Sequence, residues 1–184
     1  KAVASGHETI VHLPMEPLSY PKSDPGKNAI FVHQSDSEIE RRVEGFIKSL
    51  PLCVGMNNHM GSLATSDERV MKAVLKVVGK HNLYFVDSFT SSSSVAYKVA
   101  QQMLIPSFKR DLFIDTPDIT EKTLNKYIQD LKKMKENNDQ VLVITHCTRE
   151  KLNHLILFME KVQAIGYEIV PVSALFESEL PDII

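Results

Sequence analysis

The stretch "VGMNNHMGSLATSDERV" (54–70) joins the end of a short apolar run to the start of an amphipathic helical pattern. Between the two lie Asn57, Asn58 and His59, followed by a methionine and a glycine. Asparagine and glycine tolerate left-handed backbone, so one interpretation of this stretch is turn chemistry alone. The other interpretation is that His59 ends a strand and faces a functional site. The rest of the chain is needed to choose between them.

The same strand-to-helix pattern recurs along the chain. Short runs rich in β-branched residues predict strands at 9–13, 52–56, 83–88, 111–115 (or from 107), 141–145 and 168–172. The run at 141–145 has no polar alternation, which is typical of a parallel strand covered on both faces. Strands begin roughly every 25–45 residues, the spacing of βα units. The sequence therefore predicts an α/β fold with mostly parallel strands.

Capping signals predict where the helices begin. Ser35 with Glu38, and Thr65 with Glu68, have capping-box spacing ahead of apolar residues at helical intervals. Further helices are expected at 95–103, 124–134 and 152–162. We expect Thr148 to cap the last of them.

Two segments lie outside this pattern. The segment 14–34 holds four prolines and no helical period, which predicts a long loop that serves as a lid or contacts a substrate. The segment "KAVASG" (1–6) resembles the last turn of a helix capped by Gly6. A domain rarely begins in this way. We therefore expect one domain over 1–184 that is N-terminally incomplete, with its first strand or strands absent from this chain.

The composition excludes few function classes, but it favours some of them over others. The 184 residues are 43% hydrophobic and 24% charged with a net charge of -2, as in an ordinary soluble domain. The lack of a basic excess argues against nucleic acid as a partner. No apolar run reaches the length of a membrane span, and no signal peptide is visible. Two cysteines do not define a disulfide framework.

Polar residues gather at the carboxyl ends of the predicted strands. They are His12, His59, Asp87 with Ser88, Asp115 and His146, and the fourth strand also carries Arg110 and Asp111 near its start. In parallel α/β folds, sites form at the carboxyl ends of the strands. One histidine after a strand is usually structural, but five strand ends with such groups favour a site. His59 is then one member of a ring of functional groups.

The residue types favour metal chemistry. Histidine and carboxylate together select zinc and similar divalent ions, and a hydrolytic site leaves one coordination position for water. No G-x-S-x-G motif indicates a serine hydrolase, and no glycine-rich loop indicates a nucleotide. Cys147 adjoins His146, but neighbouring residues at a strand end point in opposite directions, which disfavours a Cys–His nucleophile pair.

Several segments together resemble the divergent polysaccharide deacetylase family, a remote branch of the polysaccharide deacetylase superfamily of carbohydrate esterases. They are "GHETIVHLPMEP" (6–17), "GMNNHMGSLATSDERVMKAVL" (55–75), "FVDSFTSSSSVAYKVA" (85–100), "IPSFKRDLFID" (105–115) and "GYEIVPVSAL" (166–175). The similarity runs through nearly the whole chain. It implies a distorted (β/α) barrel with a metal site, most simply zinc, at one end.

The resemblance also implies a ligand set. In the superfamily, two aspartates on a strand that would precede Lys1 supply a metal ligand and the catalytic base. A histidine after the "GHE" segment and a second one four residues later complete the metal site. Here these positions are His12 and Glu16, so either Glu16 supplies an oxygen ligand or His59 takes the place of the second imidazole. We favour His59, because it ends a strand and two imidazoles suit zinc.

The remaining roles follow from the same resemblance. The superfamily's apolar strand that ends in histidine matches "VLVITH", which makes His146 the expected general acid. Asp87 and Asp111 are the other expected catalytic residues, which would orient His146 or bind sugar hydroxyls. The alternative for each of these polar residues is an ion pair that holds the top of the barrel together. The residues expected to bind substrate are Asn58, Ser88, Arg110 and Asp115.

The implied function is metal-dependent removal of acetyl groups from a carbohydrate of the cell envelope, outside the cytoplasm. The alternative is a non-catalytic glycan-binding or envelope-organising protein that retains the barrel. Loss of the second-motif histidine favours the alternative, whereas histidines at three strand ends favour the hydrolase.

Overall fold

The computed structural model describes residues 2–114, 120–136 and 140–176. The described chain forms two compact units that divide between Lys109 and Arg110, and each is considered by itself. The prediction of one domain over 1–184 stays a prediction. None of the described helices has the length and hydropathy needed to cross a membrane.

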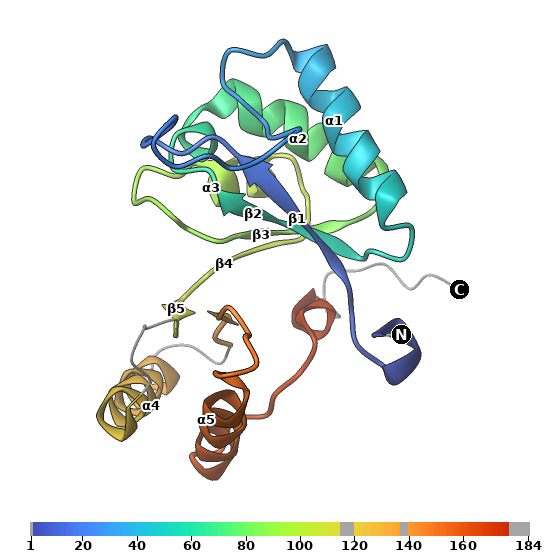
Figure 1. Cartoon of the computed structure of the whole chain (residues 1–184). Coiled ribbons are helices and arrows are strands. Elements are labelled where there is room, and N and C mark those ends of the chain that lie inside the picture. The colour runs from blue at the N-terminus through green and yellow to red at the C-terminus, as the bar shows by residue number, and fades with distance from the viewer. Residues whose placement is uncertain (1, 115–119, 137–139, 177–184) are drawn as a thin grey trace. The chain divides into compact units, whose positions relative to one another are not determined.

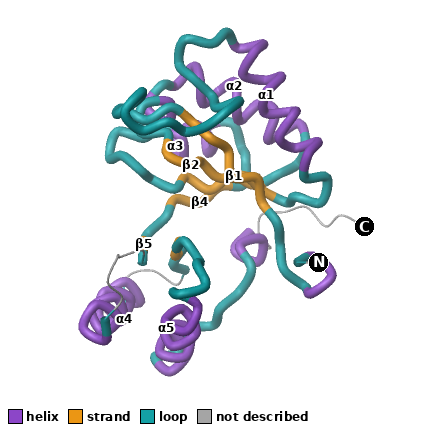
Figure 2. Tube along the Cα trace, in the orientation of Figure 1, coloured by secondary structure: helices purple, strands orange, loops and turns teal. Residues whose placement is uncertain are grey.

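The first unit is built on a parallel sheet of four strands, β1 (Ile10–Met15), β2 (Gly55–Met60), β3 (Tyr84–Asp87) and β4 (Ser107–Lys109). Each strand pairs with the one before it in the chain, so the strand order is β1-β2-β3-β4 (Figures 1 and 2). Helices connect the strands, as parallel pairing requires. The prediction of an α/β fold with parallel strands is confirmed.

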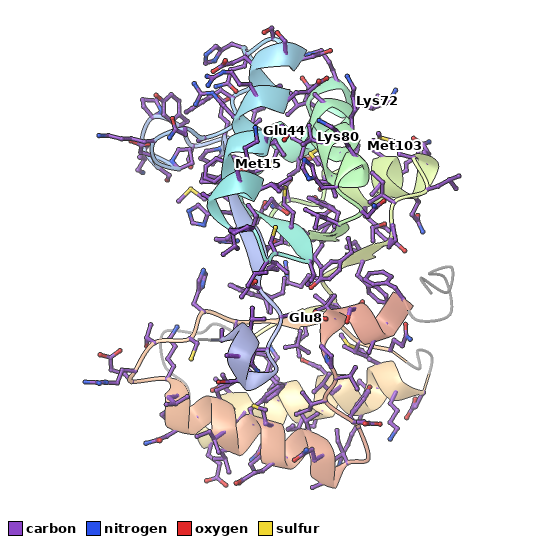
Figure 3. All side chains as sticks on the ribbon, turned by 90° about the vertical axis from the view of Figure 1, so that its right-hand side faces the viewer. Glu8, Met15, Glu44, Lys72, Lys80 and Met103 are labelled. Atoms are coloured by element: carbon purple, nitrogen blue, oxygen red, sulfur yellow. The ribbon has the colours of Figure 1, made fainter. Side chains whose placement is uncertain are left out.

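Three helices connect these strands: α1 (Asp36–Ser49), α2 (Glu68–Lys80) and α3 (Ala96–Gln102). Helices α1 and α2 pack side by side, and Lys80 Nζ of α2 lies 2.7 Å from Glu44 Oε1 of α1 (Figure 3). The apolar residues that recur at helical intervals along both helices are buried, as their spacing predicts.

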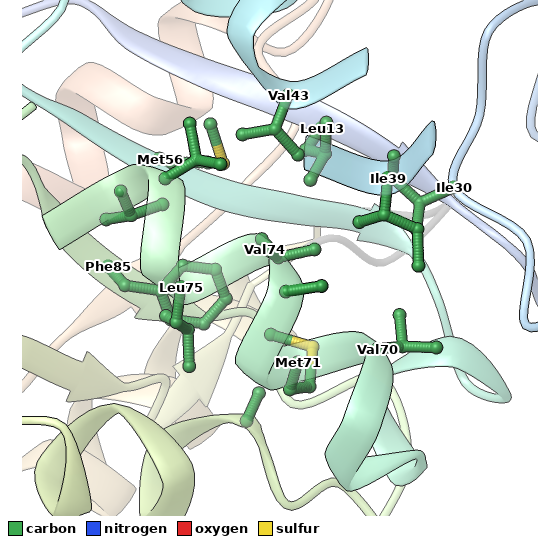
Figure 4. Packing of buried hydrophobic residues seen from close by; sticks show 14 of the residues in the cluster. Leu13, Ile30, Ile39, Val43, Met56, Val70, Met71, Val74, Leu75 and Phe85 are labelled. Carbon is green, nitrogen blue, oxygen red and sulfur yellow. The ribbon is translucent and has the colours of Figure 1, made fainter. Parts of the chain in front are cut away.

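The apolar core of the first unit lies between these helices and one face of the sheet. Leu13, Met56 and Phe85 from three adjacent strands are fully buried in it (Figure 4). Side chains alternate along a strand, so the neighbours His12 and Asn57 point to the opposite face. The histidines of β1 and β2 therefore lie on the face of the sheet that points away from this core.

The helix starts agree only in part with the capping signals. Ser35 accepts a hydrogen bond from the Glu38 backbone N at 3.3 Å, so this predicted cap is confirmed. Thr65 was the wrong choice for α2, because Asp67 caps it by accepting from Val70 N at 3.0 Å. A short 3-10 turn at Ala64–Ser66 moves the helix start beyond Thr65, whose hydroxyl donates to Gly61 O instead.

The proline-rich loop is tied to the end of β1. Met15 forms an isolated parallel bridge with Ile30, and the Glu16 backbone N donates to Ile30 O at 2.8 Å. The ring of Tyr20, 45% exposed, packs edge-on against Phe31 with centroids 5.0 Å apart. The predicted loop is therefore an ordered excursion that begins and returns at the carboxyl edge of the sheet.

The second unit contains a parallel pair, β5 (Leu112–Phe113) and β6 (Val143–Ile144), with α4 (Glu121–Lys135) and α5 (Leu152–Ala164). The two helices share an apolar cluster that includes Leu124, Leu131 and Phe158. Thr148 does not cap α5, because Lys151 occupies the N-cap position without a side-chain hydrogen bond.

The strand expected at 168–172 is wrong. Pro171 has no N–H to give to a ladder, and its carbonyl accepts from Ala174 N at 3.1 Å to begin the 3-10 helix Val172–Phe176. Ile169 and Val170 remain 43% and 40% exposed.

Candidate functional site

His12 and His59 lie next to each other at the carboxyl end of the β1–β2 pair. His12 Nε2 is 3.0 Å from His59 Nδ1, and the ring centroids are 4.8 Å apart in an edge-on arrangement. In register, Asn57 is opposite His12 and His59 is opposite Pro14, so His12, Asn57 and His59 share one face. His12 is exposed and His59 is half-buried. The sequence prediction that these two histidines belong together agrees with this geometry.

A chain of hydrogen bonds supports His12 from below. Asn57 Oδ1 lies 2.9 Å from His12 Nδ1, and Asn57 Nδ2 donates to Ser88 Oγ at 3.1 Å. Ser88 Oγ in turn donates to the backbone O of Asn58 at 2.8 Å. Asn57 is 7% exposed and Ser88 is 9% exposed, so water competes little with these bonds. Ser88 thus supports His12 rather than presenting its hydroxyl to a ligand.

Sequence reasoning did not find Asn57, although a signal for it exists. Asn57 precedes His59 by two residues, which places both on one face of a strand. The turn tendency of consecutive asparagines conceals this periodicity.

The residues after Asn57 form the turn that ends β2. Asn58 is 1% exposed, with Oδ1 accepting from Ser88 N and Nδ2 donating to Met60 O, both at 2.8 Å. Met60 and Gly61 have positive φ angles of 54° and 85°. A Cβ on Gly61 would lie 2.9 Å from Met15 Cβ. Asn58 was predicted to bind substrate, but its amide is used within the chain to join β2 to β3 and to hold this turn.

Glu16 points its carboxylate into the proline-rich loop. Its Oε2 accepts from Val32 N at 2.8 Å, and the residue is 9% exposed. Among the residues that the model describes, no three His, Cys, Asp or Glu side chains are grouped closely enough to hold a metal. Glu16 therefore does not join His12 and His59 in a three-ligand group in this structure.

Asp87 ends β3 and is fully buried. Its Oδ1 accepts from Phe89 N at 2.8 Å, and its Oδ2 accepts from Ser94 Oγ at 2.8 Å and Tyr97 N at 3.4 Å. The carboxylate thus closes the turn after β3 and the start of α3. These contacts are those of a structural carboxylate, although the sequence prediction gave Asp87 a catalytic role.

The predicted polar residues of the second unit lie around its strand pair. Asp111 Oδ2 accepts from Leu142 N at 2.8 Å, joining the segments that lead into β5 and β6. The pKa of Tyr167 is raised above its ordinary value, mainly by burial and to a smaller extent by the charge of Asp111. The Arg110 guanidinium lies 5.2 Å from the centroid of the Phe113 ring. Asp115 lies outside the described residues.

His146 follows β6 and is exposed. Its ring lies edge-on to Phe113 at 5.6 Å between centroids. Together with Cys147 and His154 it lines a cavity of about 10 Å³ in the second unit, which is room for about one water molecule. The position at the carboxyl end of a parallel pair is the one predicted from the sequence.

The first unit is thus a parallel α/β fold with two histidines in contact at its strand ends. The model of the divergent polysaccharide deacetylase family matches residues 1–176, and the chain belongs to that family.

The chain also resembles two curated proteins that are themselves uncharacterized. It is 42% identical to YibQ of Escherichia coli over 115 residues, which is 62% of this chain and 35% of that protein. It is 33% identical to a protein of Haemophilus influenzae over 115 residues, 62% of this chain and 40% of that protein. The chain thus matches less than half the length of these relatives.

Two solved structures share the fold. An uncharacterized protein from Agrobacterium tumefaciens superposes with a TM-score of 0.85 at 23% identity, covering 94% of this chain and 70% of that one. A putative cellobiose-phosphate cleavage protein from Enterococcus faecalis gives a TM-score of 0.51 at 15% identity, covering 92% and 76%. At these identities the likeness concerns the fold alone.

Proposed function

We propose that the protein is a metal-dependent hydrolase that removes acetyl groups from a carbohydrate, with His12 and His59 as metal ligands. One observation carries the proposal: His12 Nε2 and His59 Nδ1 are 3.0 Å apart. Two nitrogens bound to one tetrahedral zinc at about 2.0–2.1 Å are separated by about 3.3 Å. The two nitrogens are therefore a few tenths of an ångström closer together than two ligands of one zinc ion.

The chemistry of the donors fits the same ion. Imidazole nitrogen suits zinc and related transition metals, and each of the two rings brings one nitrogen to the contact. Catalytic zinc sites use three protein ligands. The proposal takes the third to be an aspartate, as in the wider superfamily that the chain resembles.

A divalent metal at this position would supply a water of lowered pKa and polarise the carbonyl oxygen of the acetyl group. The protein's own residues then have separate tasks. His12 and His59 would hold the ion through Nε2 and Nδ1. His146 donates a proton to the leaving amine or alkoxide as general acid. Arg110 and Asp115 remain predictions for contacts with sugar hydroxyls. We place the substrate in the cell envelope, outside the cytoplasm, on the family resemblance.

Metal binding is the first test. Zinc affinity is measured by isothermal titration calorimetry on the full-length protein and on His12→Ala and His59→Ala. We expect each substitution to weaken zinc binding by at least tenfold, whereas His7→Ala, an exposed histidine before β1, leaves it unchanged. Unchanged affinity in either site variant would remove that residue from the proposed centre.

Turnover is the second test. Release of acetate from N-acetylated oligosaccharides is measured with the zinc-loaded full-length protein. We expect release by the wild type and strong loss in His146→Ala with zinc affinity retained. Zinc binding and glycan binding without acetate release would instead support the non-catalytic glycan-binding alternative.

A further inference from the structure

The donor and acceptor in each hydrogen bond that supports His12 can be assigned, because the series ends at a backbone carbonyl. The backbone O of Asn58 can only accept, so Ser88 Oγ donates its single proton there, at 2.8 Å. Ser88 Oγ must then accept in its other contact, from Asn57 Nδ2 at 3.1 Å.

This direction fixes the orientation of the Asn57 amide. A flipped amide would set its Oδ1 against Ser88 Oγ with no proton between the two oxygens. With Nδ2 on Ser88, Oδ1 faces His12 Nδ1 at 2.9 Å. An amide oxygen can only accept, so the proton in this contact belongs to His12 Nδ1.

We propose that Asn57 and Ser88 are positioning residues that hold neutral His12 in the Nδ1–H tautomer, with the lone pair on Nε2. In the metal-free protein His12 Nε2 then accepts from His59 Nδ1–H at 3.0 Å, and His59 must move this proton to its other nitrogen for both atoms to hold one ion. Metal-ligating histidines commonly donate their other ring N–H to a carbonyl or carboxylate, which fixes both tautomer and ring orientation. Asn57 supplies that acceptor, and Ser88 fixes which end of Asn57 is presented.

The tautomer itself follows from hydrogen bonding alone. Its role in presenting Nε2 to a metal rests on the proposed function. The two can therefore be tested separately on the same protein.

The first measurement is the tautomer of His12 in the metal-free full-length protein, by two-bond ¹H–¹⁵N correlation NMR at about pH 8.5, where imidazole is ordinarily neutral. His12→Gln identifies the signal. We expect a pyrrole-type Nδ1 and a pyridine-type Nε2. A dominant Nε2–H form in the wild type would overturn the proposal, whether or not the protein binds metal.

Variants then separate positioning from folding. Ser88→Ala frees the Asn57 amide to rotate, and Asn57→Leu removes the acceptor, so both should give mixed tautomers at His12. Asn57→Asp keeps an acceptor and should retain the Nδ1–H form. Ser94→Ala is the matched control, because Ser94 also ends a loop beside β3 but donates to Asp87. If Ser88→Ala and Asn57→Leu, both folded by circular dichroism, keep the wild-type tautomer, the positioning role is excluded.

Zinc affinity gives the second readout. Loss of an outer partner of a ligating histidine typically weakens binding by about 10- to 100-fold. We expect that loss in Ser88→Ala and Asn57→Leu, a smaller change in Asn57→Asp and none in Ser94→Ala. A wild-type protein with the Nδ1–H tautomer that binds no zinc would refute the proposed function but not the tautomer. Equal zinc affinity in all variants would refute the role of Asn57 and Ser88 toward the metal.

Discussion

The ring of Tyr84 occupies the space that a side chain at Gly55 would need. The two residues are register partners in β2 and β3, and a Cβ on Gly55 would overlap the ring of Tyr84. Tyr84 is held there by burial and by its hydroxyl, which donates to Glu8 Oε2 at 3.0 Å. The pKa of Tyr84 is raised well above its ordinary value, mainly by burial and to a smaller extent by the charge of Glu8.

Gly55→Ala should therefore destabilise the first unit, by about 1–3 kcal/mol as for other overpacked cores. Urea unfolding followed by circular dichroism measures the change. Gly45→Ala is the control, since Gly45 lies exposed within α1 and a Cβ there meets nothing within 4 Å. Alanine at that helix position should stabilise by about 0.5–1 kcal/mol. Equal effects at the two glycines would contradict the steric argument.

Gly61→Ala should disturb the histidine pair as well as stability. Gly61 has a φ of 85°, and its Cβ would meet Met15 at 2.9 Å, two residues after His59. Gly26→Ala is the control that separates backbone strain from side-chain overlap. Gly26 also has a positive φ (98°), but a Cβ there would meet no atom within 4 Å. Both variants should lose stability. Only Gly61→Ala should also weaken zinc binding, and calorimetry that finds the same zinc affinity in both would count against this turn as a support of His59.

Asp87→Ala should cost stability, because it leaves three donors without their acceptor. Hydrogen bonds to a charged group contribute about 1.5–3 kcal/mol each, so we expect a loss of roughly 3 kcal/mol or more in thermal or urea unfolding. Ser94→Ala removes one of these bonds and should cost about 1.5–3 kcal/mol, less than Asp87→Ala. A fully stable Asp87→Ala protein would return Asp87 to the list of catalytic candidates.

The ion pairs between α1 and α2 should make stability depend on pH. Hydrogen bonds from Lys80 first, and then His81, hold the pKa of Glu44 below the ordinary carboxyl value of 4.5. This pKa is lower in the folded than in the unfolded protein. Ionised Glu44 therefore stabilises the fold fully at pH values above its unfolded-state pKa. The contribution is lost as the pH falls through the folded-state pKa.

Glu44→Gln should therefore be less stable than the wild type at about pH 7 and equally stable at about pH 3. Lys80 is exposed and Glu44 is half-buried, so about 1 M salt at neutral pH should also reduce the difference. Urea unfolding at the two pH values and in high salt measures this. A difference that stays constant down to about pH 3 would show that Glu44 acts through packing rather than charge.

The sequence was sufficient for the alternation of parallel strands and helices and for the pairing of His12 with His59. Both depend on periodicity and on where strands end, which are local properties. The roles of Asn57, Asn58 and Ser88 depend on register and on the direction of each hydrogen bond. Neither is encoded in residue spacing, so these residues could be predicted as polar groups near a site but not as its support.

The errors have local causes too. Thr65 has a better capping-box pattern than Asp67, but a 3-10 turn precedes α2 and shifts its start. The β-branched residues before Val172 predict a strand, but Pro171 begins a helical turn instead. In both cases a single backbone turn overrides a pattern read from side chains.

The neighbour-to-neighbour order of β1 to β4 has a consequence for biosynthesis. Each strand after β1 pairs with a strand that was synthesised before it. Cotranslational folding of this unit can therefore proceed by successive addition, without waiting for a distant strand to be inserted between two earlier ones.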